Sequence, residues 1–305
     1  MSAYIVKRIV SAVITLFLVA TLTFFLMYLV PGGPFLSEKA PSQQTLKALH
    51  EKYGLDKPIW VQYLNYMKRL IRGDLGTSLK MRGQEVNDII KTRFPVSAKL
   101  GLMAILLAVC IGIPMGAVAA LNRGRWPDRL IMFFSTLGIA VPGFVTATVL
   151  MLFFGVRLHV LPTFGLTSPL HYVLPVVSLA FYPTSYISRL MRSSMLDVLG
   201  QDYMRTARAK GLSRLKALFK HALRNAVLPV VTYLGPMLAN ILTGSFVIEK
   251  IFTIPGLGSQ FVGSITDRDY PLIMGTTIFL AFLLITMNVI VDIAYKIIDP
   301  RIKLK

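Results

Sequence analysis

Six long apolar stretches are the feature that most constrains the fold of this chain. Each has about 20 residues, the length at which an α-helix crosses the hydrocarbon core of a bilayer. Helices buried in a large soluble core are also apolar, but six such stretches in 305 residues favour a membrane protein. We predict an all-α, polytopic integral membrane protein whose six transmembrane helices are Ile9–Val30, Leu100–Asn122, Leu130–Val156, Leu170–Ser188, Ala226–Ile248 and Tyr270–Val291.

A cleaved signal peptide is an alternative interpretation of the first stretch. Ile9–Val30 contains no charged residue, and it is longer than the apolar run of about 7–15 residues in signal peptides. Its end, LMYLVPGGP, offers no small-residue cleavage motif. We interpret the stretch as a first span that is retained.

The chain has few charged residues, but its net charge is strongly positive. Only 15% of the residues are charged, against about 25% in soluble domains. A net charge of +19 suits either nucleic acid or an anionic membrane surface. The basic residues flank the apolar stretches and are not interleaved with aromatic residues on a soluble domain, which argues against a nucleic-acid partner.

The positions of the basic residues predict that both termini are cytoplasmic. In that orientation only Arg157, Lys250 and Arg268 lie in the two shorter outer loops. The outer segment 31–95 holds more basic residues, but at about 65 residues it is long enough to be translocated regardless of charge. The inner basic residues are Lys7, Arg8, Arg123, Arg125, Arg129, the Lys and Arg residues from Arg189 to Arg224, Lys296, Arg301, Lys303 and Lys305.

We expect the outer segment 31–95 to be a small helical insertion. The run SQQTLKALHEKYG predicts a helix from a cap at Ser42 to Gly54, a residue suited to the position after a helix. A second helix is predicted with Asp56 as its cap and Pro58 in its first turn. In this helix, Trp60, Tyr63, Met67 and Leu70 form an apolar stripe at helical spacing. The stripe predicts packing on the membrane helices rather than ligand binding.

Proline and glycine in the spans predict close packing and bending. Gly112 and Gly116 have the G-x-x-x-G spacing that lets membrane helices approach each other. Pro142 lies inside the third predicted span and is a candidate for a bend that opens a pathway. Plain helix packing is the alternative role for the prolines.

Catalytic and metal-binding patterns are missing. No Asp, Glu, Lys or Arg lies well inside a predicted span, so an ion-coupled transporter lacks its usual carriers, and an intramembrane enzyme lacks its polar pair. The dipeptide Gly-Lys is absent, which excludes a P-loop for ATP. We predict no cofactor, no metal and no enzymatic activity. The histidines His50, His159, His171 and His221 show no metal-ligand spacing.

The longest inner loop contains a basic stretch with a central glycine. Residues 205–224 hold seven Lys and Arg residues and no acid. The run DYMRTARAK predicts one short helix before Gly211, and Ser213 predicts the cap of a second. A helix on a lipid surface would look similar, but a helix–glycine–helix elbow suits docking into a groove of another protein. The second helix would present one apolar face made of Leu215, Leu218, Phe219 and Ala222.

At this loop the chain resembles the membrane-spanning permease subunits of bacterial ABC importers. Their loop pattern is Glu-Ala-Ala, three residues, Gly, nine residues, then Ile-x-Leu-Pro, of which Ala207, Gly211 and Leu223 match. The departures agree with the peptide-importer branch, whose usual text is RTARAKG…HALRNA.LP. The resemblance to oligopeptide-permease B-type subunits covers essentially the whole chain, through FFLMYLVPGGPF, GDLGTS, FPVSAKLG, GIAVPGF, PMLANILTGSFVIEKIFTIPGLGS, DRDYP and IIDPRIK.

The resemblance implies a type I ABC importer fold in the bacterial inner membrane. The partners would be a homologous second permease, two cytoplasmic ATP-binding subunits and an extracytoplasmic solute-binding protein that delivers a peptide. Nickel, haem or a glycoside is the alternative cargo. The implied coupling residues, which contact the ATPases, are Arg205, Thr206, Ala207, Gly211, Leu212 and Ser213, and the gating candidates are Pro142 and Phe144.

The expected organisation has four parts. Residues 1–30 are the N-terminal tail and first span, and 31–95 are the extracytoplasmic insertion. Residues 96–299 form the permease core, with a cytoplasmic coupling loop at about 197–224, and 300–305 are a cytoplasmic tail.

Overall fold

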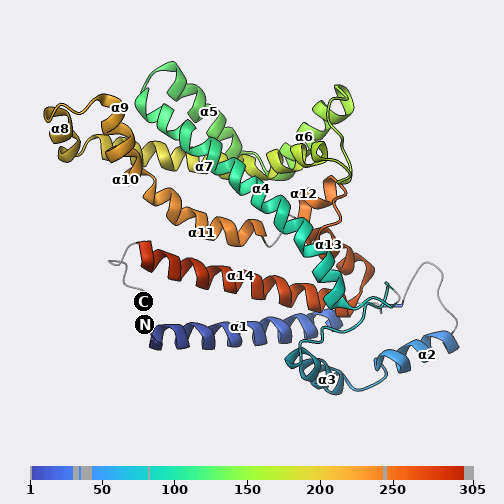
Figure 1. Cartoon of the computed structure of the whole chain (residues 1–305). Coiled ribbons are helices and arrows are strands. Elements are labelled where there is room, and N and C mark those ends of the chain that lie inside the picture. The colour runs from blue at the N-terminus through green and yellow to red at the C-terminus, as the bar shows by residue number, and fades with distance from the viewer. Residues whose placement is uncertain (1, 30–33, 36–42, 82, 243–245, 299–305) are drawn as a thin grey trace. The chain divides into compact units, whose positions relative to one another are not determined.

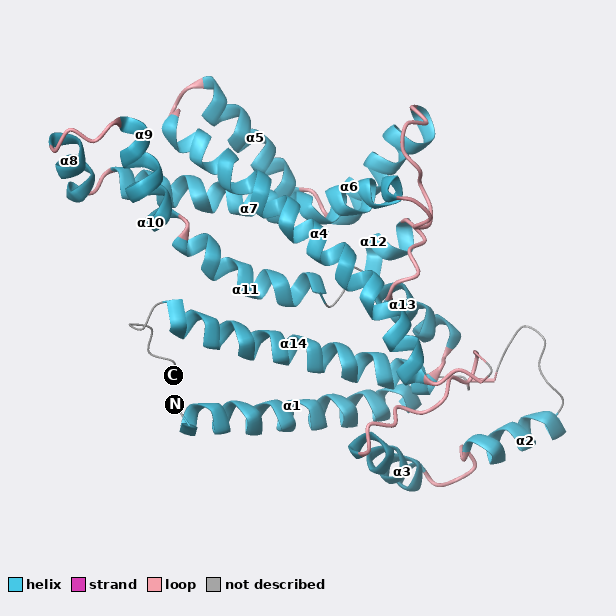
Figure 2. Ribbon diagram, viewed as in Figure 1, coloured by secondary structure: helices cyan, strands magenta, loops and turns pink. Residues whose placement is uncertain are grey.

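The fold is described from a computed structural model, and the description covers residues 2–29, 34–35, 43–81, 83–242 and 246–298. These residues form helices joined by turns (Figures 1 and 2), with one isolated antiparallel bridge between Thr77 and Glu85. The α-helices are α1 Ser2–Leu29, α2 Gln43–Tyr53, α3 Ile59–Ile71, α4 Val86–Leu121, α5 Trp126–Ala140, α6 Gly143–Leu150, α7 Val173–Leu199, α8 Asp202–Ala209, α9 Arg214–Ala217, α10 Arg224–Ala226, α11 Leu228–Leu242, α12 Phe246–Ile251, α13 Leu257–Asp267 and α14 Tyr270–Ile298. Segments η1 Met151–Arg157 and η3 Leu218–Leu223 are π-helical, and η2 Pro169–Tyr172 is a 3₁₀-helix.

Within the described part of the chain, three helices are long and apolar enough to cross a membrane: Val6–Leu29, Val86–Leu121 and Tyr270–Val291. A fourth span is counted if Trp126–Ala140 and Gly143–Arg157 are one broken span. The predicted fourth span falls in η2 and α7. The predicted fifth falls in α11 and α12, with residues 243–245 outside the described part of the chain.

The third predicted span is not one straight helix. It breaks at Pro142, where the chain bends by 108° between the two halves. Pro142 has an extended backbone (φ −58°, ψ 140°) and stands at the cap position of α6. Because proline lacks an N–H and disfavours the helical conformation for the residue before it, α5 ends at Ala140.

The chain divides into two compact units. The first consists of residues 1–96 and 256–286, and the second of residues 97–255 and 287–305. In the first unit, Phe24 and Met27 of α1 pack with Met274 and Ile278 of α14 in a small buried cluster. The helix α3 packs on this cluster through Tyr63, Tyr66, Met67 and Leu70.

The predicted helices of the outer segment are confirmed, but one cap is not. Gly54 ends α2 with φ +67°, and the N–H of Leu55 donates to the carbonyl of His50, as expected for a helix-terminating glycine. The predicted cap at Ser42 lies outside the described residues. Asp56 does not cap α3: the cap position is Pro58, whose carbonyl accepts the N–H groups of Val61 and Gln62.

The second unit is built around α7. The helices α5, α6, α10 and α11 all pack against it, and α4 approaches it at its glycines. A Cβ added at Gly112 would lie 2.8 Å from the Ile187 side chain, and one at Gly116 would clash with the backbone of Ser188. The predicted close packing at the G-x-x-x-G spacing is therefore confirmed.

Candidate functional site

The basic loop folds as the expected helix–glycine–helix elbow. The first limb is α8, and the second runs from α9 through η3 to α10. Gly211 has φ +78°, and the N–H of Leu212 donates to the carbonyl of Ala207 at 3.3 Å. This bond and the left-handed glycine are the marks of a helix-terminating motif. The cap of the second limb is also as expected, since the Ser213 hydroxyl accepts the N–H of Lys216 at 3.4 Å.

The side chains of the elbow divide into an exposed set and a buried set. Arg205 and Thr206 are exposed. The Arg205 guanidinium lies 3.6 Å from the carboxylate of Asp202, an exposed contact that contributes little to stability. Ala207 is buried and Leu212 is half-buried, so they pack the inside of the turn. The six predicted coupling residues thus lie along the second half of α8 and the turn that follows it.

The predicted apolar face of the second limb is only partly correct. Ala222 is buried and Leu218 half-buried, but Phe219 is 64% exposed. The side chain of Leu215 lies outside the description. Because Leu218–Leu223 is π-helical, the 3.6-residue spacing used for the prediction does not hold there. Phe219 is therefore an exposed aromatic residue on an otherwise basic surface.

A side-chain hydrogen bond joins the two limbs where they meet the rest of the unit. The amide of Asn225 donates to the hydroxyl of Tyr203 at 2.9 Å. Asn225 belongs to α10, which packs on α7, and Tyr203 belongs to α8. The bond therefore connects the first limb of the elbow to the end of the second limb.

A buried ion pair links α5 to α7. Arg192 donates to both carboxylate oxygens of Asp128, from Nε at 2.5 Å and from Nη2 at 2.8 Å. The N–H of Gly124 donates to the same carboxylate at 2.8 Å. Asp128 is buried, whereas Arg192 keeps part of its side chain in solvent. The sequence analysis missed this pair. Asp128 is the one acid in a run that contains Arg123, Arg125 and Arg129, and this isolated acid was a signal that it has a specific partner.

The two gating candidates lie apart from the elbow in sequence, at the break between α5 and α6. Pro142 provides the break itself, and Phe144 follows it in the first turn of α6 with an exposed ring. Both halves of the broken span pack on α7. The elbow also reaches α7, through η3 and α10. One helix is therefore in contact with both predicted sites.

A second buried carboxylate organises the first unit. Asp269 accepts the hydroxyl of Ser78 and the N–H of Leu79, the latter at 3.1 Å. The same carboxylate accepts the N–H of Leu272 at 3.4 Å and so caps the start of α14. Asp269 therefore fastens the loop after α3 to a membrane helix. Sequence reasoning did not identify this role.

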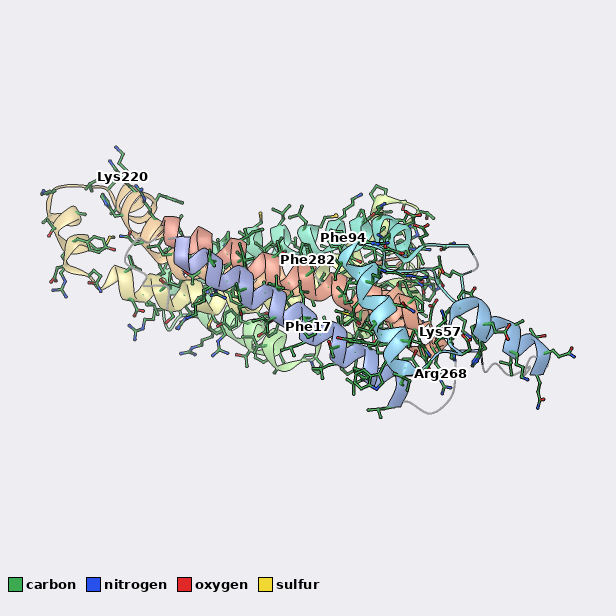
Figure 3. All side chains as sticks on the ribbon, turned by 90° about the horizontal axis from the view of Figure 1, so that it is seen from below. Phe17, Lys57, Phe94, Lys220, Arg268 and Phe282 are labelled. Carbon is green, nitrogen blue, oxygen red and sulfur yellow. The ribbon has the colours of Figure 1, made fainter. Side chains whose placement is uncertain are left out.

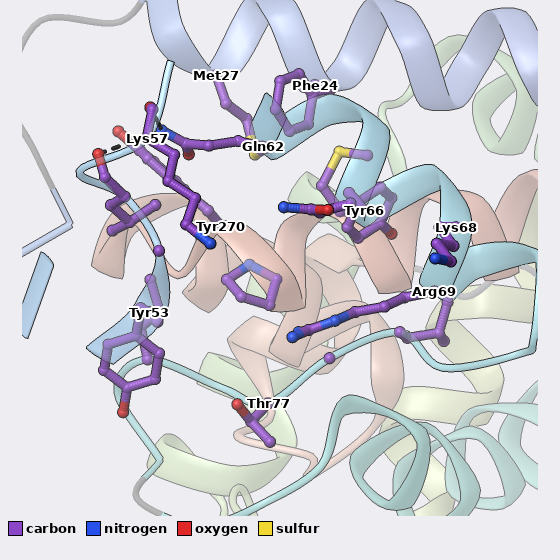
Figure 4. Close-up of a pocket in the computed structure, with 18 of the residues that line it drawn as sticks. Phe24, Met27, Tyr53, Lys57, Gln62, Tyr66, Lys68, Arg69, Thr77 and Tyr270 are labelled. Carbon is purple, nitrogen blue, oxygen red and sulfur yellow. Dashed lines mark hydrogen bonds between the residues drawn. The ribbon is translucent and has the colours of Figure 1, made fainter. Parts of the chain in front are cut away.

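A cavity of about 700 Å³ lies in the first unit, between the ends of α1 and α14, the helix α3 and the loop that follows it (Figure 4). Its aromatic lining includes Phe24, Tyr66 and Tyr270. Burial raises the pKa of the Tyr66 hydroxyl above its usual value, and the nearby charge of Asp74 adds to the effect. The cavity lining carries one acid, Glu51, against four cations, namely Lys57, Lys68, Arg69 and Arg72.

Among the described residues, no group of three or more His, Cys, Asp or Glu side chains is arranged to hold a metal ion. The geometry of the described residues presents a helix–glycine–helix elbow, a broken helix and a cavity in the first unit.

Comparison with known families decides the identity of this arrangement. The family described as "Binding-protein-dependent transport system inner membrane component" matches residues 112–304, and its N-terminal companion, the membrane component N-terminal region, matches residues 1–101. The chain belongs to this family of transport permeases.

Curated relatives match over the full length. The chain is 50% identical over 304 residues to the dipeptide transport system permease protein DppB of Bacillus subtilis, covering 100% of this chain and 99% of the relative. It is 46% identical to the oligopeptide transport system permease protein OppB of Haemophilus influenzae, covering 99% and 100%. It is 41% identical to OppB of Escherichia coli, again covering 99% and 100%.

Solved structures show the same fold. An inward-facing structure of the MetNI methionine ABC transporter contains a chain with a TM-score of 0.54 and 17% identity, covering 69% of this chain and 94% of that one. A chain of an amino acid ABC transporter crystallised with histidines gives a TM-score of 0.51, covering 71% and 95%. The permease is thus an all-α, multi-pass inner-membrane protein with the type I ABC importer fold.

Proposed function

We propose that this permease forms, with a homologous second permease, the translocation pathway of an ATP-driven peptide importer. The observation that carries the proposal is the full-length identity of 41–50% to permeases whose names specify dipeptide or oligopeptide transport. An external binding protein delivers the peptide, and two cytoplasmic ATPases supply the energy. The absence of a P-loop in this sequence supports the assignment of ATP hydrolysis to partners.

The proposed topology places both termini in the cytoplasm. Residues 31–95 then form an extracytoplasmic insertion, 96–299 the permease core with its cytoplasmic loop at about 197–224, and 300–305 an inner tail. The asymmetry of the basic residues supports this orientation. In it, the elbow faces the ATPases and the outer cavity faces the side from which peptide arrives.

In the proposed mechanism the elbow docks into a groove on an ATPase. Arg205 and Thr206 are exposed for this contact, and the left-handed turn at Gly211 fixes the angle between the limbs. When ATP closes the ATPase dimer, the docked elbow moves with it. The Tyr203–Asn225 hydrogen bond ties the first limb to α10, so the movement passes to that helix.

The same movement would reach the pathway through α7. This helix packs against the second limb of the elbow and against both halves of the span that breaks at Pro142. A shift of α7 therefore acts directly on the break, where Phe144 presents an exposed ring. Alternation of the break between two arrangements would open the pathway to one side of the membrane at a time.

Reconstitution tests the proposal. Proteoliposomes with both permeases, both ATPases and the binding protein should take up labelled dipeptides or oligopeptides in an ATP-dependent manner, and omission of this permease should abolish uptake. Nickel, haem and glycosides offered with the same components serve as the competing cargoes. ATP-dependent uptake of one of those in place of peptide would refute the peptide assignment.

A further inference from the structure

The helix α3 has a second apolar face that the described chain leaves mostly exposed. One face packs on α1 and α14 through Tyr63, Met67 and Leu70. Beside it, at spacings of four and seven residues, Trp60, Leu64 and Ile71 are 68%, 64% and 85% exposed. Such spacings place the three side chains on one side of the helix. An exposed apolar stripe of this kind marks a contact with lipid or protein.

The contacts of α3 fix its depth relative to the membrane. The hydroxyls of Tyr63 and Thr21 are 2.8 Å apart and hydrogen-bonded, and the rings of Trp60 and Phe25 meet at 5.2 Å. Thr21 and Phe25 belong to the apolar span Val6–Leu29. At about 1.5 Å per residue, Phe25 lies about 6 Å, and Thr21 about 12 Å, inside the end of that span. The helix α3 therefore lies against the span, at the boundary between headgroups and hydrocarbon.

An apolar groove continues from the stripe toward the middle of the membrane. Leu64 and Ile71 form part of its wall, and its volume is about 900 Å³. The opposite walls come from the two membrane helices α1 and α14, on which Phe17 and Phe282 are labelled in Figure 3. The other lining residues are Val13, Leu16, Tyr63, Met67, Leu70, Gly73, Leu75, Ile278 and Phe279. A lining of this composition, running along a span, suits an acyl chain.

Cations border the same stripe on its other side. Lys68 follows Leu64 by one helical turn, and Arg72 follows Lys68 by another. Both are exposed, and both also line the outer cavity, where Figure 4 shows Lys68 and Arg69 on α3. The helix thus presents, in order around its surface, a packed face, an exposed apolar stripe and a positive edge. This order is typical of a helix that lies in the membrane interface and binds anionic lipid.

We propose that α3 and the groove form a binding site for an anionic phospholipid. The acyl chain lies in the groove beside Leu64 and Ile71, and the phosphate pairs with Lys68 and Arg72. Trp60 lies at the headgroup level, which is where tryptophan is enriched in membrane proteins. The site requires only that α1 spans the membrane; its assignment to the outer leaflet rests on the proposed orientation.

Tryptophan fluorescence can test the site directly, because the chain has only Trp60 and Trp126. In a Trp126→Phe background, the full chain is placed in nanodiscs, alone and assembled with its partner subunits. Phosphatidylglycerol or phosphatidylcholine with brominated acyl chains is then titrated in as the quencher. We expect Trp60 to be quenched in both preparations, with roughly a thirtyfold preference for phosphatidylglycerol from the two cations.

Paired charge variants separate the site from general electrostatics. Lys68→Gln/Arg72→Gln should abolish the preference for phosphatidylglycerol while quenching persists. The control Lys47→Gln/Lys80→Gln, which removes two exposed cations of the same segment outside α3, should keep the preference. Three results would overturn the site: no quenching by either lipid, quenching that disappears on assembly because a protein covers the stripe, or equal quenching by both lipids. None of these results depends on transport, so the peptide assignment is tested separately.

Discussion

The side-chain amide of Asn225 donates a 2.9 Å hydrogen bond to the hydroxyl of Tyr203, and this bond closes the base of the elbow. Tyr203 lies in the first turn of α8, before Gly211, and Asn225 lies well beyond it in α10. The bond holds together two limbs that are otherwise connected through a turn whose φ only glycine adopts readily. A displacement of one limb is therefore expected to move the other limb as well.

Tyr203→Phe should uncouple ATP turnover from uptake. The change removes only the hydroxyl and, with it, a hydrogen bond worth about 1 kcal/mol, so the permease should still insert and recruit its ATPases. We expect the number of ATP molecules hydrolysed per peptide imported to rise several-fold in proteoliposomes. Asn225→Ala should do the same, and the double variant should be no worse than either single one. Additive losses would show that the two residues act separately.

Gly211 is expected to tolerate asparagine but not valine. Beyond its chain neighbours, no described atom lies within 4 Å of a Cβ built at this position, so the demand for glycine comes from the backbone conformation. A β-branched residue is costly at φ +78°, whereas asparagine visits this region. Gly211→Val should reach the membrane in normal amounts and lose peptide uptake, while Gly211→Asn should keep most of it.

Charge removal provides the contrasting experiment for the elbow. If residues 205–224 only rest on anionic lipid, Lys216→Gln/Lys220→Gln should impair uptake more than Gly211→Val, which leaves every charge in place. We expect the reverse order. Uptake that survives Gly211→Val but fails in the double glutamine variant would refute the coupling role.

The proposed orientation predicts which sites a membrane-impermeant thiol reagent reaches. In a Cys110→Ala background the chain has no other cysteine. A cysteine at Lys47, exposed on α2, should be labelled in intact cells, and one at Lys216, exposed on α9, should be labelled only after the membrane is opened. The opposite pattern would invert the topology.

Features that depend on neighbouring residues could be predicted from the sequence. Among the described residues, apolar length predicted the three long spans and the broken one. Gly54 and Gly211 marked helix ends because left-handed backbone strongly favours glycine. The expected apolar face around Phe219 was only partly correct, because the spacing assumed an α-helix where the chain is π-helical.

Contacts between distant residues could not be predicted in the same way. Asp128 and Arg192 are 64 positions apart, and Asp269 and Ser78 are 191 positions apart. No local spacing pairs these side chains. They are brought together by the packing of α5 on α7 and by the contact of the loop after α3 with the start of α14. The depth of α3, which decides its proposed contact with lipid, likewise depends on its contacts with Thr21 and Phe25.

The ion pair between Asp128 and Arg192 should contribute more to the stability of the fold than the pair between Asp202 and Arg205. Asp128→Asn leaves the partly buried guanidinium of Arg192 without its carboxylate. Breaking a fully buried pair costs about 3–5 kcal/mol, and the partial exposure of Arg192 reduces this to about 2–3 kcal/mol. The matched change Asp202→Asn breaks the exposed contact with Arg205, which is worth at most about 1 kcal/mol.

Thermal unfolding of the purified permease should therefore show a clearly lower melting temperature for Asp128→Asn and little change for Asp202→Asn. Equal shifts would mean that the pair between α5 and α7 does not hold these helices together.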